Sequence, residues 1–303
     1  MRLGLYLGGH SFTGRELDFV RLARVAEDAG LDDVALGEHL VMGGDNPTPP
    51  WGGRFVHRKD EPFPEPLTTL AVIAGATSRI RLITAILIAP LRAPVLLAKT
   101  VATVHALSNG RLVLGVSTSW HADEYAAVGV PFEERGQRLD DAIGACRALW
   151  SAAPASFSSP TVSFDNIYCV PRPNTVDDIP IWFTGNMRKQ LVRRVANYGH
   201  GWLPWLGFDT PLEALAADIH VLREATRAAS RDPDKLDVAV RFRTMGRSLE
   251  QAVEEDIPLM RRIGITEAHV PLLSLVPSLD EAPALIHRLA RLFEPHRATA
   301  VTA

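Results

Sequence analysis

Short apolar runs that stop abruptly at small, polar or ionisable residues recur along this chain. The clearest is Leu112 to Ser117, which stops at Thr118-Ser119-Trp120. Apolar runs of this length are typical of parallel strands buried on both faces. Between the runs, apolar residues return every three or four positions, as from Glu16 to Ala29, where Gly30 ends the segment. The pattern predicts strands and helices in alternation.

The alternation comprises eight strand-helix units. Strands are expected at 3–7, 33–37, 81–88, 112–117, 181–183, 201–203, 238–242 and 267–272. Helices are expected at 16–29, 67–77, 94–107, 132–150, 211–229, 249–263 and 279–293. A further helix, between the fifth and sixth strands, is expected to end at 195. Eight units in 303 residues favour an α/β fold of the (β/α)8 TIM barrel type, with one domain over 1–303. A Rossmann-type open sheet is the alternative, although the chain has no Gly-x-Gly-x-x-Gly.

Two segments interrupt this alternation. Residues 43–66 are rich in Gly and Pro, and a loop of that length is usually functional or disordered. Residues 153–180 contain Ser and Pro clusters around β-like stretches at 161–164 and 167–170, which predicts an inserted hairpin. Both segments are expected to cover the site.

Charge and composition narrow the class of partner. The net charge is -3 and the chain has no Lys/Arg block. We therefore expect a small-molecule substrate and expect neither nucleic acid nor a membrane as a partner. Cys146 and Cys169 stand alone, which disfavours disulfides and a zinc site. The chain shows no signal-peptide pattern and no run of about eighteen apolar residues, so we expect a soluble cytoplasmic protein. Abundant Ala and Arg suggest a high-GC bacterial source.

In a TIM barrel the catalytic groups lie where the strands end. Glu38 and His39 follow the second predicted strand. His39 is the candidate acid or base, because a free imidazole titrates near neutrality and Glu38 could fix its tautomer. A histidine that merely hydrogen-bonds the loop backbone is the alternative interpretation.

A second candidate is the junction Thr184-Gly185-Asn186-Met187-Arg188-Lys189 between the fifth strand and the following helix. Free backbone N–H groups at a helix start attract phosphate. Gly185 could equally be a simple turn residue, and Arg241 and Arg243 near the seventh strand are a competing phosphate site.

Other chemistries have weaker support. The stretch from Gly115 to Ser119 lacks the closing glycine of a nucleophile elbow, which disfavours a serine hydrolase. The histidines show no metalloprotease spacing, so no metal site is predicted. A binding protein without turnover would have the same barrel, but a titratable group at its mouth argues for an enzyme.

Taken in order, these blocks resemble the bacterial luciferase-like monooxygenase superfamily, and within it the oxidoreductases that use the deazaflavin coenzyme F420. The resemblance runs over nearly the whole chain and includes Gly37-Glu38-His39, Pro66-Leu67-Thr68-Thr69-Leu70, Leu107-Ser108-Asn109-Gly110-Arg111, Leu114-Gly115-Val116 and Gly199-His200-Gly201-Trp202. It implies the same TIM barrel with an inserted segment.

The resemblance also implies roles for individual residues. His39 would act as acid or base beside the reactive face of the ring, and Glu38 would help to hold the cofactor. Ala85 and Ile86 would form the bulge that supports the ring, often through a non-proline cis peptide. The remaining predicted cofactor contacts are Ser117, Trp120, Asp123, Thr184, Gly185, Asn186 and Met187.

Three of these positions depart from related patterns. Thr184 replaces the first glycine of the commoner Gly-Gly pair before the phosphate. The sugar-phosphate dehydrogenase branch carries Glu where this chain has Trp120, and Asn where it has Asp123. That branch is therefore not expected.

The implied reaction is hydride transfer between coenzyme F420 and a small organic substrate, with His39 moving the proton. The alternative is an FMN-dependent monooxygenase that uses O2 and reduced flavin from a reductase partner, and a second alternative is a flavin-binding barrel without catalysis. A homodimer is expected. Candidates to meet the acidic tail of coenzyme F420 are Arg54, Arg58 and Lys189. A partly apolar ligand is suggested by Trp51, Phe55, Ile167 and Tyr168.

Overall fold

Eight parallel strands close into a barrel. A computed structural model describes residues 1–8, 18–43, 62–206 and 210–297. The barrel strands are β1 (Arg2–Tyr6), β2 (Asp33–Leu36), β3 (Arg81–Thr84), β5 (Leu112–Ser117), β8 (Ile181–Thr184), β9 (Gly201–Leu203), β10 (Asp237–Arg241) and β11 (Glu267–Pro271). Pairing of β3 with β5 closes the ring. The predicted (β/α)8 TIM barrel is confirmed.

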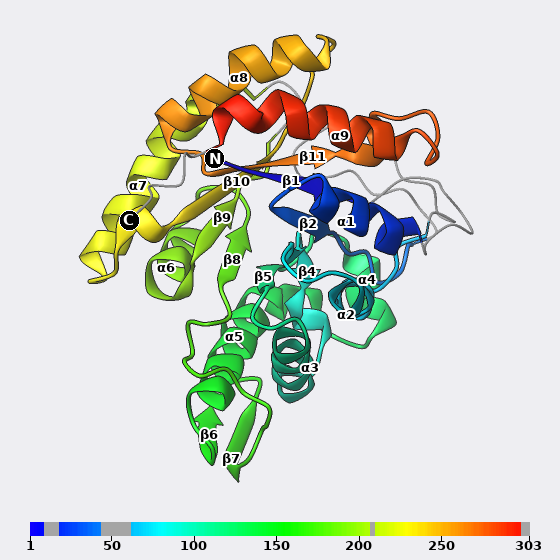
Figure 1. The fold of residues 1–303 in the computed structure, drawn as a ribbon. Coiled ribbons are helices and arrows are strands. Elements are labelled where there is room, and N and C mark those ends of the chain that lie inside the picture. Colours follow the sequence, from blue (N-terminus) through cyan, green and yellow to red (C-terminus); the bar gives the residue numbers. More distant parts are fainter. Residues whose placement is uncertain (9–17, 44–61, 207–209, 298–303) are drawn as a thin grey trace.

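Helices surround the barrel (Figure 1). They are α1 (Asp18–Asp28), α2 (Pro66–Ala76), α3 (Pro94–Leu107), α4 (Ala122–Ala127), α5 (Arg135–Ser151), α6 (Lys189–Tyr198), α7 (Leu215–Ala228), α8 (Leu249–Ile263) and α9 (Ala282–Phe293). Short 3-10 turns lie at Ala89–Leu91, Phe132–Glu134, Leu212–Ala214, Pro233–Lys235, Leu272–Ser274 and Glu294–His296. No helix of the described part combines the length and apolarity that a bilayer span requires.

Local sequence signals explain where these helices begin and end. In α8, Ser248 and Gln251 form a capping box that satisfies free N–H groups of the first turn. The same helix ends at Gly264, whose φ of 94° is readily adopted only by glycine. The predicted helix 249–263 therefore has the observed bounds.

The core has two layers. Inside the barrel a small cluster comprises Tyr6, Ala35, Ile83, Val113, Trp182 and Ala239. A larger cluster lies between the strands and the helices. Because successive strand residues point to opposite faces, Arg241 lies on the same inward face of β10 as Ala239, at the carboxyl end of the barrel.

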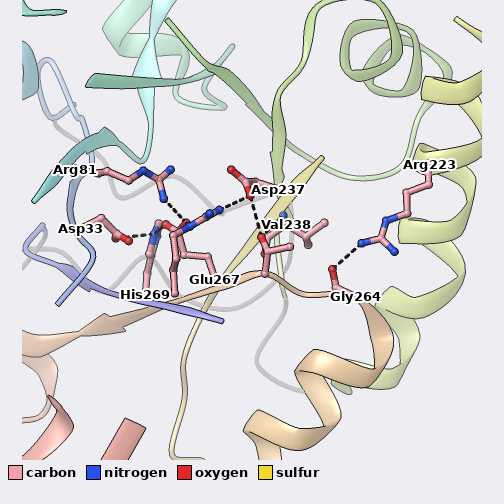
Figure 2. Close-up of polar contacts among 10 residues, drawn as sticks. Asp33, Arg81, Arg223, Asp237, Val238, Gly264, Glu267 and His269 are labelled. Carbon is pink, nitrogen blue, oxygen red and sulfur yellow. Dashed lines mark hydrogen bonds and ion pairs between the residues drawn. The ribbon is translucent and has the colours of Figure 1, made fainter. Parts of the chain in front are cut away.

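The amino end of the barrel carries a buried polar network (Figure 2). Nε2 of His269 lies 2.5 Å from Oε1 of Glu267 and 3.1 Å from Oδ1 of Asp33. The other carboxylate oxygen of Glu267 accepts hydrogen bonds from Arg2 at 2.7 Å and from Arg81 at 2.8 Å. None of these residues was predicted to interact, although each belongs to a predicted strand or lies next to one.

The third predicted strand is divided. β3 stops at Thr84, the Ala85–Ile86 peptide bond is cis, and β4 (Leu87–Ile88) continues along β5. A Cβ at Gly115 would lie 2.0 Å from the Thr84 carbonyl oxygen, so β5 can approach β3 this closely only because residue 115 is glycine. The single strand predicted over 81–88 was wrong in this detail, because apolar pattern alone does not reveal a break in pairing.

The insertion contains the predicted hairpin with different strands. Its antiparallel strands are β6 (Ala155–Ser158) and β7 (Ser163–Ile167), beside α5 (Figure 1). Residues 161–162 lie in the turn, which the Ser159 N–H closes by donating to the Val162 carbonyl at 2.9 Å. The predicted strands at 161–164 and 167–170 were therefore misplaced, since Thr and Val favour strands wherever they occur.

Some predictions lie outside the described residues. They concern the start of the first helix at 16–17 and, within 44–61, the side chains of Trp51, Arg54, Phe55 and Arg58.

Candidate active site

His39 lies directly beyond β2 at the carboxyl end of the barrel. Its Nδ1 is 3.4 Å from Oε1 of Glu124, and its side chain is only 13% exposed. The imidazole makes edge contacts with Phe63 and Trp120, at centroid distances of 5.0 and 6.3 Å. A titratable ring therefore lies beside a buried carboxylate and between two aromatic side chains.

Glu124, on α4, fixes the backbone around His39. Its Oε1 accepts the Leu40 N–H at 2.7 Å, and its Oε2 accepts the Ser119 hydroxyl at 2.9 Å. His121 contributes a second link, because its Nε2 accepts the Gly43 N–H at 3.4 Å. The segment that follows β2 is thus tied to the segment that follows β5.

Glu38 turns away from His39. Its Oε2 accepts the Ile88 N–H at 2.6 Å and an Arg92 guanidinium N–H at 3.0 Å, and its side chain is 1% exposed. Burial raises the pKa of the Glu38 carboxyl, and the hydrogen bonds from Arg92 and Ile88 offset part of that rise. The carboxylate beside His39 is that of Glu124, whereas Glu38 was expected there. Its contact with a cofactor stays a prediction.

The cis peptide at Ala85–Ile86 lies next to the end of β2. The Ala85 N–H donates to the Leu36 carbonyl at 2.6 Å. A Cβ at Gly37 would lie 2.3 Å from the Tyr6 hydroxyl oxygen and 3.3 Å from the Ala85 carbonyl oxygen. The ends of β1, β2 and β3 therefore meet tightly, and a glycine at position 37 permits the contact.

Other predicted residues extend this region along β5. Ser117 is buried and pairs in register with Ile88. Trp120 stacks on His121 at 5.5 Å. A Cβ at Gly43 would lie 1.7 Å from Oδ2 of Asp123, so that carboxylate packs against the segment after β2.

The junction after β8 is held by β9. The Thr184 hydroxyl and the Gly185 N–H both donate to the Leu203 carbonyl, at 2.5 and 3.4 Å, and the Trp202 indole donates to the Gly185 carbonyl at 3.1 Å. Gly185 has a φ of +135°, and a Cβ there would meet no atom within 4 Å. The loop presents open space at Gly185, while exposed Asn186 and half-buried Met187 follow it.

The structure thus brings His39, Trp120 and Asp123 together through α4. Thr184 and Gly185 contact β9 instead. The sequence interpretation missed Glu124, His121, Phe63 and Arg92. Glu124 belongs to a quoted family block, but no local pattern shows that it contacts Leu40 from 84 positions away.

One group of described residues could hold a metal ion. Donor atoms of Asp33, Glu267 and His269 lie within 4.8 Å of one another. Arg2 and Arg81 already neutralise Glu267, and their charges would oppose a divalent cation beside it. We therefore propose no metal there.

Comparison with known proteins agrees with this architecture. The family model described as luciferase-like monooxygenase matches residues 5–294. The chain belongs to the luciferase-like monooxygenase family. The resemblance inferred from the sequence blocks is confirmed.

The relatives of this chain include enzymes named for two different cofactors. The chain is 29% identical over 250 residues to the F420-dependent glucose-6-phosphate dehydrogenase of Kineococcus radiotolerans, which covers 80% of this chain and 67% of that enzyme. It is 31% identical over 181 residues to the FMNH(2)-dependent dimethylsulfone monooxygenase of Pseudomonas fluorescens, which covers 59% of this chain and 46% of that one.

A solved structure shows the same fold. Monooxygenase RslO1 from Streptomyces bottropensis superposes with a TM-score of 0.78 at 20% identity, over 98% of this luciferase-like chain and 100% of the other.

Proposed function

We propose that this luciferase-like protein is an oxidoreductase that transfers a hydride between coenzyme F420 and a small organic substrate. The observation that carries the proposal is the pairing of His39 with Glu124 at the carboxyl end of the barrel. Membership of a family of oxidoreductases and monooxygenases supports an enzyme.

His39 would be the proton donor or acceptor. A carboxylate beside Nδ1 favours a proton on that nitrogen and orients the ring, which leaves Nε2 as the atom that exchanges a proton with substrate. The buried Glu124 is itself fixed by Leu40 and Ser119, so the imidazole is held before any ligand arrives. Preorganised acid or base groups of this kind contribute about a hundredfold or more to rate.

The described residues fit a flat ring with a phosphorylated tail. Aromatic side chains flank His39, the ends of β1, β2 and β3 meet tightly at Gly37, and Gly185 faces open space in front of a helix start. When bound, a deazaflavin would accept or supply the hydride. The Ala85–Ile86 segment and Trp120 would border the ring, and the backbone of Asn186 and Met187 would meet the phosphate.

We favour coenzyme F420 over FMN because the F420-dependent relative aligns with a larger share of this chain. The F420-dependent relative aligns over 80% of this chain, and the FMNH(2)-dependent relative over 59%. Glucose-6-phosphate is not carried over as substrate, because Trp120 and Asp123 differ from the residues that the sugar-phosphate branch carries. An FMN-dependent monooxygenase, supplied by a reductase partner, is the second candidate.

Titration of the purified protein with coenzyme F420 and with FMN tests the proposal. We expect quenching of deazaflavin fluorescence with a dissociation constant at least tenfold lower than that for FMN. Reduced coenzyme F420 should stay reduced in air when bound, and substrate turnover should proceed without oxygen. Tight binding of FMN alone, with turnover that stops under anaerobiosis, would establish the monooxygenase instead.

A further inference from the structure

Arg92, which lies between β4 and α3, binds two carboxylates with one guanidinium. Both oxygens of Glu38 accept hydrogen bonds from it, Oε2 at 3.0 Å. Oε1 of Glu65 accepts from the same guanidinium at 2.7 Å. The side chains of Arg92 and Glu38 are only 16% and 1% exposed, so solvent screens this contact weakly. One side chain thus joins the segment after β2, the start of α2 and the segment before α3.

Two of the joined segments carry an aromatic contact of the candidate catalytic residue. Glu38 directly precedes His39 in the chain. Glu65 lies two residues after Phe63, whose ring meets the His39 ring edge to face at a centroid distance of 5.0 Å and an angle of 84°. The guanidinium of Arg92 therefore connects the backbone on both sides of this contact.

The segment that leads into α2 is stiff enough to transmit this connection. Its sequence is Pro62-Phe63-Pro64-Glu65-Pro66, and each proline fixes its own φ and restricts the residue before it. Glu65 is also the N-cap of α2, because its Oε2 accepts the Thr68 N–H at 2.6 Å. Arg92 thus holds the start of the helix, with Phe63 before it, against the segment after β2.

The charges of this group explain why the arginine is needed. Burial raises the pKa of Glu38, Arg92 opposes the rise, and the nearby charge of Glu65 adds to it. Burial would also raise the pKa of Glu65, but hydrogen bonds from Thr68 and Arg92 hold it below its ordinary value. Without the guanidinium, two carboxylates would repel each other, and the start of α2 would lose its attachment to the segment after β2.

We infer that Arg92 is a positioning residue for His39, because it holds Phe63 against the imidazole by binding Glu38 and Glu65 together. The χ2 torsion of a histidine has only a broad preference, so the orientation of its ring depends on the groups beside it. A misplacement of about 1 Å at a reacting group can cost about a hundredfold in rate. The inference rests on the proposed function for the reaction that would slow, whereas the orientation of the His39 ring belongs to the protein alone.

The orientation of the imidazole is tested without any cofactor. The NMR resonance of the His39 Cε1–H, identified by its loss in His39→Ala, is recorded in the wild type, in Arg92→Gln and in Glu65→Gln. Both variants should move this resonance, because the ring current of the neighbouring phenyl group acts on it. Arg147→Gln is the matched control, since Arg147 is 21% exposed and pairs with Asp177 outside the candidate site. A resonance that stays in place in both variants, or moves equally in the control, would overturn the inference.

Glu65→Gln keeps the test decisive if Arg92→Gln does not fold. Its amide oxygen can still accept the Thr68 N–H and cap α2, while the charge that attracts Arg92 is gone. A moved resonance in this variant, with the helix content of the wild type by circular dichroism, supports the inference. It therefore separates loss of position from loss of the fold.

A kinetic cycle tests whether Arg92 acts through Phe63. We measure kcat and KM for Arg92→Gln, Phe63→Leu and the double variant, with any cofactor and substrate that the wild type turns over. Each single variant should lower kcat about tenfold with little change in KM, and the double variant should lose no more than the worse single variant. Losses that multiply would overturn the inference. A moved His39 resonance in a protein that binds neither coenzyme F420 nor FMN would refute the proposed function and still support the role of Arg92.

Discussion

The first residues of β1, β2, β3, β10 and β11 are all charged and gather at the amino end of the barrel, whereas the carboxyl end holds His39 and Arg241. At the amino end, the single carboxylate of Glu267 hydrogen-bonds with two arginines, Arg2 and Arg81, and with His269 (Figure 2). At the carboxyl end, His39 lies 3.4 Å from its carboxylate and Arg241 packs on an aromatic face. The amino-end charges pair with one another, whereas we propose that His39 at the carboxyl end acts on a ligand.

The pKa directions express the same difference. Burial alone would lower the pKa of His269, but the carboxylates of Asp33 and Glu267 raise it to about 9. Burial favours the neutral form of Glu267, yet His269 and the arginines hold its pKa well below the usual range. The ion network at the amino end of the barrel thus stabilises the fold, while the candidate active site lies at the carboxyl ends of the same strands.

The largest expected effect comes from breaking the amino-end network. Glu267→Gln would leave Arg2, Arg81 and His269 without their shared carboxylate, and it should cost about 3–5 kcal/mol of unfolding free energy. Chemical denaturation at pH 7 measures this loss. Glu250→Gln, which removes an exposed pair with Arg288, should lower the unfolding free energy far less, because solvent screens that pair. Equal losses in the two variants would contradict a special role for the network.

Stability should fall in alkaline solution because of His269. Its pKa is about 9 in the folded protein against an ordinary 6.5, so its contribution is complete below about pH 6.5 and disappears as the pH rises through 9. The full contribution is up to about 3 kcal/mol. Thermal unfolding between pH 6 and 10 measures it, with His269→Gln expected to flatten the decline. His220→Gln, an exposed change on α7, should show the same pH profile as the wild type. A steep decline retained in His269→Gln would refute the role of His269 in the alkaline loss of stability.

At the other end, His39→Ala should reduce kcat about a hundredfold, or roughly 2.7 kcal/mol, with little change in cofactor affinity or unfolding free energy. The comparison uses any substrate that the wild type turns over. His287→Ala, an exposed change on α9, provides the control. Activity equal to the wild type would remove His39 from the mechanism.

The smallest expected effect concerns the junction after β8. Gly185→Val should weaken cofactor binding about tenfold, or roughly 1.4 kcal/mol, because the side chain enters the open space and the φ of +135° suits only glycine. Fluorescence titration measures it, and Gly75→Val on α2, also with no atom within 4 Å of its Cβ, controls for an added side chain. Unchanged affinity would place the phosphate elsewhere, with Arg241 and Arg243 the next candidates.

The sequence predicted the barrel because buried parallel strands read as apolar runs. The strand at 112–117 and the helix at 249–263 were placed correctly, since both carry strong signals at their ends. The hairpin strands were misplaced because most of their side chains are partly or fully exposed, so no buried face fixes the register. The six-residue helix α4 escaped prediction because so short a segment shows too little periodicity.

The candidate site was predictable only in part. His39 follows a strand, so its position could be inferred from the local pattern. The pairing of Glu38 with Arg92 spans 54 positions, and the pairing of His39 with Glu124 spans 85 positions, so both depend on closure of the barrel. The amino-end network was missed because Asp33 and the pair Glu267 and His269 lie in two predicted strands far apart in the chain, which were considered separately.

The hydrogen bond that joins Leu40 to Glu124 has a consequence for making chimeras between family members. The segment that leaves β2 is bound to the start of α4, through Leu40 to Glu124 in its first turn and through Gly43 to its N-cap residue His121. A donor segment grafted after β2 without its own α4 would meet a foreign carboxylate and a foreign imidazole. The two segments form one exchangeable module although they are far apart in the chain, and crossovers between β2 and α4 would divide it.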